Sequence, residues 1–182
     1  MIDPSSKDLS LLGRLGSIWG VVGVSLLLAF AVYRLSIIAI DAFSYEFEWY
    51  HWLVLIGNSI FMAHSEGYKG FQQGFSPRVA ARARYILKNP RLLHVVTAPL
   101  FCMSFFYATR RRLIVAYAMT LGIIALVVVF NQISQPWRGI LDAGVVVGLS
   151  WGIASLIWFS IEALNSREFK FPPEIPLAES NE

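Results

Sequence analysis

Long uninterrupted runs of apolar residues constrain the fold of this chain more than any other feature. A helix needs about 20 consecutive apolar residues to cross the hydrocarbon core of a bilayer, and several runs approach that length. Of the 182 residues, 56% are hydrophobic and 15% are charged, whereas soluble domains carry about 25% charged residues. These values exclude a soluble domain, a disordered chain, a disulfide-rich secreted domain and a collagen-like protein. The sequence therefore predicts an all-α polytopic membrane protein.

Five hydrophobic segments are separated by polar connections. They cover about residues 18–40, 49–63, 92–108, 113–130 and 140–164. The second is the weakest, with Asn58 in its middle, and the third contains Pro99. We expect an N-terminal cytoplasmic segment at 1–17, a transmembrane helical domain at 18–164 that includes a basic cytoplasmic loop at 65–91, and a polar tail at 165–182.

The charged residues predict an orientation but leave the number of spans open. Lys and Arg are enriched in cytoplasmic loops, and residues 65–91 contain six of them, whereas residues 41–48 contain three acids and none. If the third segment spans, Arg110, Arg111 and Arg112 lie outside; if it is re-entrant or interfacial, they stay inside. The charge rule favours four spans plus a half-buried segment, and hydropathy favours five. The pattern predicts a multi-pass protein of a bacterial inner membrane.

A basic amphipathic helix is predicted at residues 76–89, with Ser76 as its N-cap, Pro77 in its first turn and apolar residues on one face. Just before it, residues 65–75 form a loop with regularly spaced glycines and aromatic residues. Both segments are candidates to contact a partner or the cytoplasmic leaflet. The alternatives are a solvated loop helix and a turn that follows the membrane surface. The candidate contact residues are Tyr68, Lys69, Phe71, Arg78, Arg82, Arg84 and Lys88.

Two glycine stripes are candidate helix-packing faces. Glycine every three to four residues lets another helix backbone approach closely, and this close packing drives helix association in lipid. The stripes serve either subunit assembly or packing within the chain. They consist of Gly16, Gly20 and Gly23 in the first segment, and of Gly144, Gly148 and Gly152 in the fifth.

Four charged residues lie within or at the ends of the apolar segments. Arg34 is the one clear charge inside a run, and such a charge is costly unless it reaches the interface or pairs with an acid. Its candidate partners are Asp142 with four spans, Glu162 with five, and Asp41 with either. Arg34, Asp142 and Glu162 are the candidate polar path of a transporter or channel.

The histidines are candidate haem or metal ligands, and one serine motif is a candidate catalytic site. His64 and His94 bracket the basic loop, so they are a possible ligand pair for one b-type haem. The ligand clustering that a zinc site requires is missing from the sequence, so no metal site is predicted. Residues 148–152 match the G-x-S-x-G pattern, but they lie in a helical run rather than at a strand-to-helix turn. No cofactor and no catalytic residue are predicted, whereas bound lipids are.

The leading functional hypothesis is a small, non-catalytic membrane subunit or scaffold that packs into a larger membrane protein assembly. Its partners would be membrane lipids and other transmembrane subunits or copies of itself, not nucleic acid. The first alternative is a transporter or channel, possibly homo-oligomeric, that uses Arg34 with Asp142 or Glu162. The second alternative is the haem protein. Few polar groups remain for an enzyme once the charges that set orientation are set aside.

Overall fold

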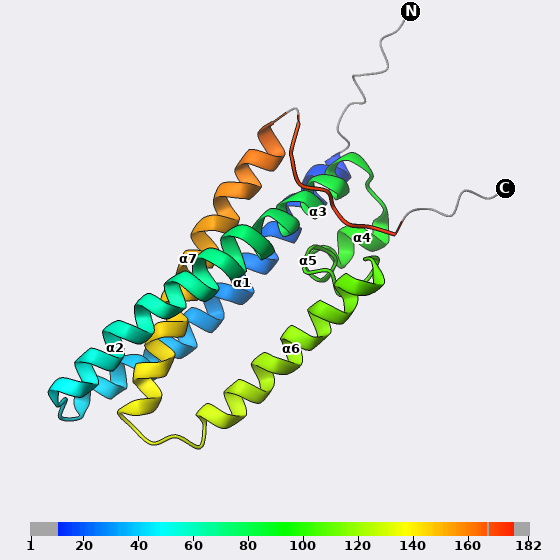
Figure 1. The fold of residues 1–182 in the computed structure, drawn as a ribbon. Helices are drawn as coiled ribbons and strands as arrows, with labels where there is room; N and C mark the ends of the chain where they lie inside the picture. The colour runs from blue at the N-terminus through cyan, green and yellow to red at the C-terminus, as the bar shows by residue number, and fades with distance from the viewer. Residues whose placement is uncertain (1–10, 167, 177–182) are drawn as a thin grey trace, which may run out of the picture.

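The computed structural model describes residues 11–166 and 168–176, and all of their regular structure is helical. The outer parts of the predicted segment 1–17 and tail 165–182 lie outside the described residues. In chain order the elements are α1 (Leu11–Asp41), η1 (Ala42–Ser44), α2 (Trp49–Met62), η2 (Ala63–Phe75), α3 (Ser76–Lys88), α4 (Leu92–Val96), α5 (Ala98–Cys102), α6 (Arg110–Phe130) and α7 (Trp137–Asn165). The start of α1 and the end of α7 lie at the same end of the molecule (Figure 1).

Three stretches are long and apolar enough to cross a membrane. They are Leu11–Ser44, which contains α1, Arg110–Phe130, which is α6, and Trp137–Asn165, which is α7. In the most apolar stretches of Leu11–Ser44 and Arg110–Phe130, only 11% and 0% of the residues are buried inside the molecule, as expected of helices surrounded by lipid. The membrane character predicted from the sequence is therefore confirmed.

One continuous helical rod replaces the loop that we expected at residues 65–75, whereas the helix that we expected at residues 76–89 is present as α3. The α-helix α2 passes directly into η2, a π-helix of 13 residues, which passes directly into α3. The loop prediction was wrong because glycines often interrupt a helix, whereas here they lie within one. A π-helix is wider than an α-helix and is normally a single turn. Here Gly67 lets the widened helix lie against α7, where a Cβ would come 2.9 Å from the Trp151 side chain.

The N-terminus of the rod is defined by a reciprocal cap. The Glu48 side chain accepts a hydrogen bond from the first turn of α2, and the Glu48 N–H donates to Nδ1 of His51 at 3.0 Å. The His51 ring then packs 4.8 Å from that of Trp137, the first residue of α7. The cap satisfies backbone groups that a helix start leaves unpaired. It also sets the starts of α2 and α7 side by side.

The rod, α1 and α7 form a three-helix bundle in which α1 runs antiparallel to the other two (Figure 1). The α7 glycines face the rod. A Cβ on Gly148 would lie 3.2 Å from Glu66, and one on Gly152 would lie 2.6 Å from the Phe71 ring. The α1 glycines face mainly α4 and α5: a Cβ on Gly20 would lie 2.8 Å from Sγ of Cys102, and one on Gly16 would lie 2.7 Å from Val95 and 2.9 Å from Ile86 of α3. Both stripes therefore pack within this chain, against different neighbours.

The third hydrophobic segment forms two short helices, α4 and α5, rather than one long helix. Pro99 lies in the first turn of α5, and Thr97 separates the two helices. Both pack against α1, and α5 also packs against α3. A core joins these elements at this end of the bundle, and it consists of Val24, Val79, Ala83, Ile86, Ala98, Phe101, Cys102 and Leu156.

The helix α6 stands apart from the bundle (Figure 1). None of its 21 residues is buried. Its first two turns touch the preceding segment, where the hydroxyl of Tyr117 donates to the Phe105 carbonyl at 3.1 Å. The most apolar of the three candidate spans is therefore the one that the chain itself covers least.

Candidate functional site

A buried arginine is the most unusual polar feature of the described structure. The side chain of Arg82 in α3 is 1% exposed, and its guanidinium donates to four backbone carbonyls. These belong to Phe101 at 2.6 Å, to Phe106 and Tyr107 at 3.0 Å, and to Pro173 at 2.9 Å. The cation also lies over the Phe101 ring, 4.1 Å from its centre. Four carbonyls and an aromatic face thus take the place of a carboxylate partner.

This cluster, which we call the Arg82 node, corrects two predictions. We predicted that Arg82 contacts lipid or a partner and that residues 76–89 form a surface helix. Instead, eight residues of α3 are buried, and Ser76 does not cap a helix. Its hydroxyl hydrogen-bonds Oγ of Ser155 in α7 at 2.7 Å. The apolar face was identified correctly, but that face packs on α1 and α7 rather than on lipid.

Aromatic rings enclose the node. His94 of α4 stacks on Phe101 with the ring centres 4.6 Å apart and lies 5.0 Å from the Tyr107 ring. Nδ1 of His94 is buried and has no hydrogen-bond partner among the described residues. Burial disfavours the charged imidazolium, and Arg91 and Arg82 act in the same direction, so the pKa of His94 is lowered. Burial likewise lowers the pKa of Arg82 to about 10, which still leaves it charged at neutral pH.

The node connects the bundle to α6 and to the C-terminal segment. Glu174 forms an ion pair with Arg112 in the first turn of α6, and its carbonyl accepts from the Thr109 N–H at 3.3 Å. Next to it, the Pro173 carbonyl accepts from Arg82. The tail that we expected to be a separate polar segment therefore passes over the junction of α3, α5 and α6. The Arg82 node is a structural junction with no exposed reactive group.

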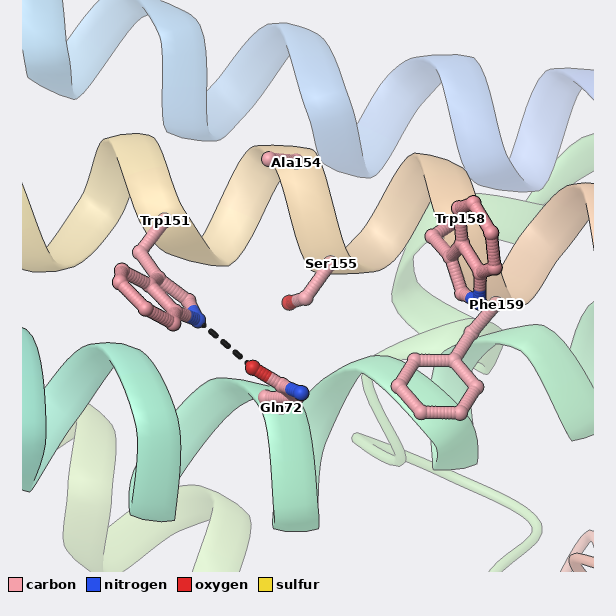
Figure 2. A pocket seen from close by; sticks show the side chains of 6 residues that line it. All are labelled: Gln72, Trp151, Ala154, Ser155, Trp158 and Phe159. Carbon is pink, nitrogen blue, oxygen red and sulfur yellow. Dashed lines mark hydrogen bonds between the residues drawn. The ribbon is translucent and has the colours of Figure 1, made fainter.

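A row of polar side chains runs along the interface between the rod and α7. Asn58 donates to the Ile140 carbonyl at 2.9 Å, and Nε1 of Trp151 donates to Oε1 of Gln72 at 2.8 Å (Figure 2). Between these pairs lies Glu66, half-buried against Gly148, with no hydrogen bond or ion pair to any described residue. Polar groups within a membrane protein usually pair across helices, as Asn58 and Gln72 do.

The four predicted intramembrane charges are not brought together. Arg34 is exposed and forms no ion pair within the part of the chain that the structure describes. Asp142 is buried and lies 3.9 Å from Arg138, one turn away on the same helix. Asp41 accepts a hydrogen bond from Gln135 at 3.1 Å, and Glu162 is exposed near the other end of α7. The candidate polar path of a transporter therefore has no continuous line of contacts here.

His64 and His94 lie in different surroundings. His64 is exposed on η2, with its ring 5.8 Å from that of Tyr68, whereas His94 is enclosed at the Arg82 node. Among residues 11–166 and 168–176, no three His, Cys, Asp or Glu side chains are grouped as metal ligands. The b-type haem stays a prediction to be tested by absorbance.

The sequence did not identify several residues that form these contacts between the rod and α7. Gln72 and Ser155 are polar residues whose pairing becomes evident only when the rod and α7 are aligned, and the aromatic residues beside them read as ordinary membrane residues. The spacing of Gly144, Gly148 and Gly152 is the signal that could have located this interface, but not its partner.

The chain matches no protein-family model, no curated protein and no solved structure.

Proposed function

We propose that this chain is a non-catalytic subunit or scaffold of a larger assembly in the inner membrane of a bacterium, and that four of its helices span that membrane. The observation that carries this proposal is the bare surface of α6, a 21-residue apolar helix without a single buried residue. Helices associate in lipid through packing of small residues and not through hydrophobicity. A helix that is held at its ends and exposed along its length is suited to pack against a transmembrane helix of another subunit.

The packing of the rod supports α2 with η2 as the fourth span. The rod follows α7 from the Tyr50–Trp137 ring contact at 6.1 Å to the Ser76–Ser155 hydrogen bond at 2.7 Å. Because α7 is long and apolar enough to span, the part of the rod beside it covers the same depth. The helices α4 and α5 have five residues each, about 7.5 Å of helix, which is too short to cross.

The distribution of charge supports the same topology. With α1, α2 with η2, α6 and α7 as spans, the start of α6, which carries the three arginines at 110–112, lies on the same side as the end of α3, which carries Lys88, and as the start of α1 and the end of α7 (Figure 1). The connection from α1 to α2, which carries Glu46 and Glu48, lies on the other side, together with the connection from α6 to α7. This asymmetry follows the positive-inside rule and makes the side with the start of α6 cytoplasmic.

Cysteine labelling tests the topology. In a Cys102→Ala background, Arg111→Cys should resist a membrane-impermeant maleimide in intact cells and react after permeabilisation. Tyr45→Cys, exposed at the opposite end, should react in intact cells and serves as the control. Reaction of Arg111→Cys in intact cells would mean five spans and would contradict this topology.

A pair of glycine substitutions tests the assembly. A Cβ on Gly122 of α6, or on Gly57 of α2, would meet no atom within 4 Å, so Gly122→Leu and Gly57→Leu should both leave the single chain folded. Ala118, Gly122 and Ala125 give α6 a row of small residues at helical spacing. We therefore expect Gly122→Leu to dissociate the assembly and Gly57→Leu to leave it intact.

The assembly is extracted from the membrane into lipid nanodiscs, and its mass is measured by native mass spectrometry. A wild-type mass above 20.4 kDa that includes other polypeptides, and that is lost with Gly122→Leu alone, supports the proposal. A lone homo-oligomer would contradict the subunit role, and equal behaviour of the two variants would contradict the role of α6. A Soret band in the purified protein would instead support the haem hypothesis.

A further inference from the structure

A shallow groove of about 360 Å³ lies between η2 and α7, on the face of the bundle away from α1 (Figure 2). Its walls are aromatic and its floor is polar. Trp158 and Trp151 are 71% and 45% exposed, so the groove opens sideways, where a spanning α7 would be surrounded by lipid. Its lining consists of Gln72, Trp151, Ala154, Ser155, Trp158 and Phe159.

A second hollow of about 180 Å³ lies at the end of α3, toward the cytoplasmic end of the bundle. It is cationic, because Arg84 and Lys88 of α3 line it together with Phe171 of the C-terminal segment. The linings of the groove and the hollow adjoin, because the ring of Phe159 in the groove lies 5.8 Å from that of Phe171 in the hollow. Arg84 is anchored at the same place, where its Nη1 donates to the Ala163 carbonyl at 3.1 Å, one turn after Phe159.

The depth of the two hollows matches the two parts of a phospholipid. Trp137 marks the outer interface, and α7 rises about 1.5 Å per residue, so Phe159 lies about 33 Å and Ala163 about 39 Å along the helix. The hydrocarbon core is about 30 Å thick, and headgroups extend several ångströms beyond it. The aromatic groove therefore runs from the inner half of the hydrocarbon, at Trp151 about 21 Å along the helix, to its inner boundary at Phe159, and Arg84 lies at headgroup level.

We propose that the groove and the cationic hollow form one binding site for an anionic phospholipid of the cytoplasmic leaflet. One acyl chain lies along Trp151, Trp158 and Phe159, and the phosphate is held by Arg84 and Lys88. The walls supply apolar area at the depth of the chains, and the two cations supply opposite charge at the depth of the phosphate. The acyl chain of a zwitterionic lipid fits the groove equally well, but its headgroup, which has no net charge, is attracted less strongly by the two cations of the hollow.

Quenching of tryptophan fluorescence by brominated lipid tests this site. The protein is placed in vesicles containing dibromo-phosphatidylglycerol or dibromo-phosphatidylcholine with identical chains, and the signal of Trp158 is taken as the difference between the wild type and Trp158→Phe. Each basic residue near anionic lipid contributes about a fivefold preference. With two such residues, we therefore expect phosphatidylglycerol to reach half-quenching of Trp158 at about one twenty-fifth of the mole fraction that phosphatidylcholine requires.

Matched variants separate a site from general surface attraction. Arg84→Gln/Lys88→Gln and the control Arg110→Gln/Arg111→Gln remove the same net charge, but Arg110 and Arg111 lie outside the hollow. The first pair should reduce the preference to less than twofold, and the control should keep most of it. Lys88→Gln alone, at an exposed position, should reduce it about fivefold without affecting folding.

The groove has its own test, because Ala154→Phe fills it without changing charge. This variant should weaken quenching of Trp158 by both lipids. Equal quenching of the wild type by the two lipids would overturn the proposal, as would equal losses in the two charge variants. Unchanged quenching in Ala154→Phe would show that no chain occupies the groove. None of these results depends on whether α6 binds a partner.

Discussion

The helices α6 and α7 have similar apolar composition and opposite surroundings. In its most apolar stretch α7 has 39% of its residues buried inside the molecule, whereas α6 has none, although α6 is the more hydrophobic of the two. The difference lies in the small residues. Three glycines of α7 receive side chains of the rod, whereas Gly122 of α6 has open space around it. In lipid, small residues rather than hydrophobicity decide which helices associate.

The Arg82 node joins these two regions, so its removal should have the largest effect. Arg82→Met leaves four carbonyls without their donor and should cost about 3–5 kcal/mol of unfolding free energy. Thermal unfolding in mild detergent measures the loss, and the exposed Arg91→Met is the control. Limited proteolysis should also cut the C-terminal segment faster in Arg82→Met. Equal melting temperatures of the two variants would mean that the node does not join α6 to the bundle.

Substituting one glycine in each helix tests the comparison directly. Gly152→Leu forces atoms against the Phe71 ring, where a Cβ alone would come within 2.6 Å, so it should destabilise the chain by about 1–3 kcal/mol. Gly122→Leu on α6 meets no neighbour and improves helix propensity, so the detergent-solubilised chain should be unchanged or slightly more stable. A loss of stability in Gly122→Leu as large as in Gly152→Leu would show that α6 packs against the bundle after all.

The buried histidine makes the junction sensitive to acid. Because the pKa of His94 is lowered in the folded state, the folded and unfolded states are both neutral well above the ordinary value of 6.5. As pH falls through that value, the unfolded state takes up the proton first, and stability is lost. The melting temperature should therefore fall more between about pH 7.5 and pH 5.5 in the wild type than in His94→Phe. Parallel pH profiles would contradict this role.

The smallest effect is expected at the contact between α6 and the C-terminal segment. Arg112 and Glu174 are 28% exposed, so Glu174→Gln should cost about 0.2–1 kcal/mol, and high salt should reduce the difference. The substitution keeps the backbone carbonyl that accepts from Thr109. An effect as large as that of Arg82→Met would mean that this ion pair, rather than the node, is the main attachment of α6 to the bundle.

The sequence predicted much of the fold because lipid imposes simple rules. Apolar runs of sufficient length located α1, α6 and α7, and the spacing of Gly144, Gly148 and Gly152 located a face that packs closely. The error at residues 65–75 has a physical cause. Glycine often ends a helix, but at Gly67 it allows a wide helix to approach Trp151, and only the neighbouring helix shows which role applies.

Long apolar runs and a scarcity of charge by themselves determined that this chain is helical and belongs in a membrane, because an unpaired backbone cannot cross hydrocarbon. Tertiary structure alone decided that Arg82 is buried among carbonyls, that the third segment forms two short helices, and that α6 remains bare. These outcomes depend on which faces meet across elements far apart in the sequence. A local pattern specifies a face, whereas its partner depends on the whole arrangement of the chain.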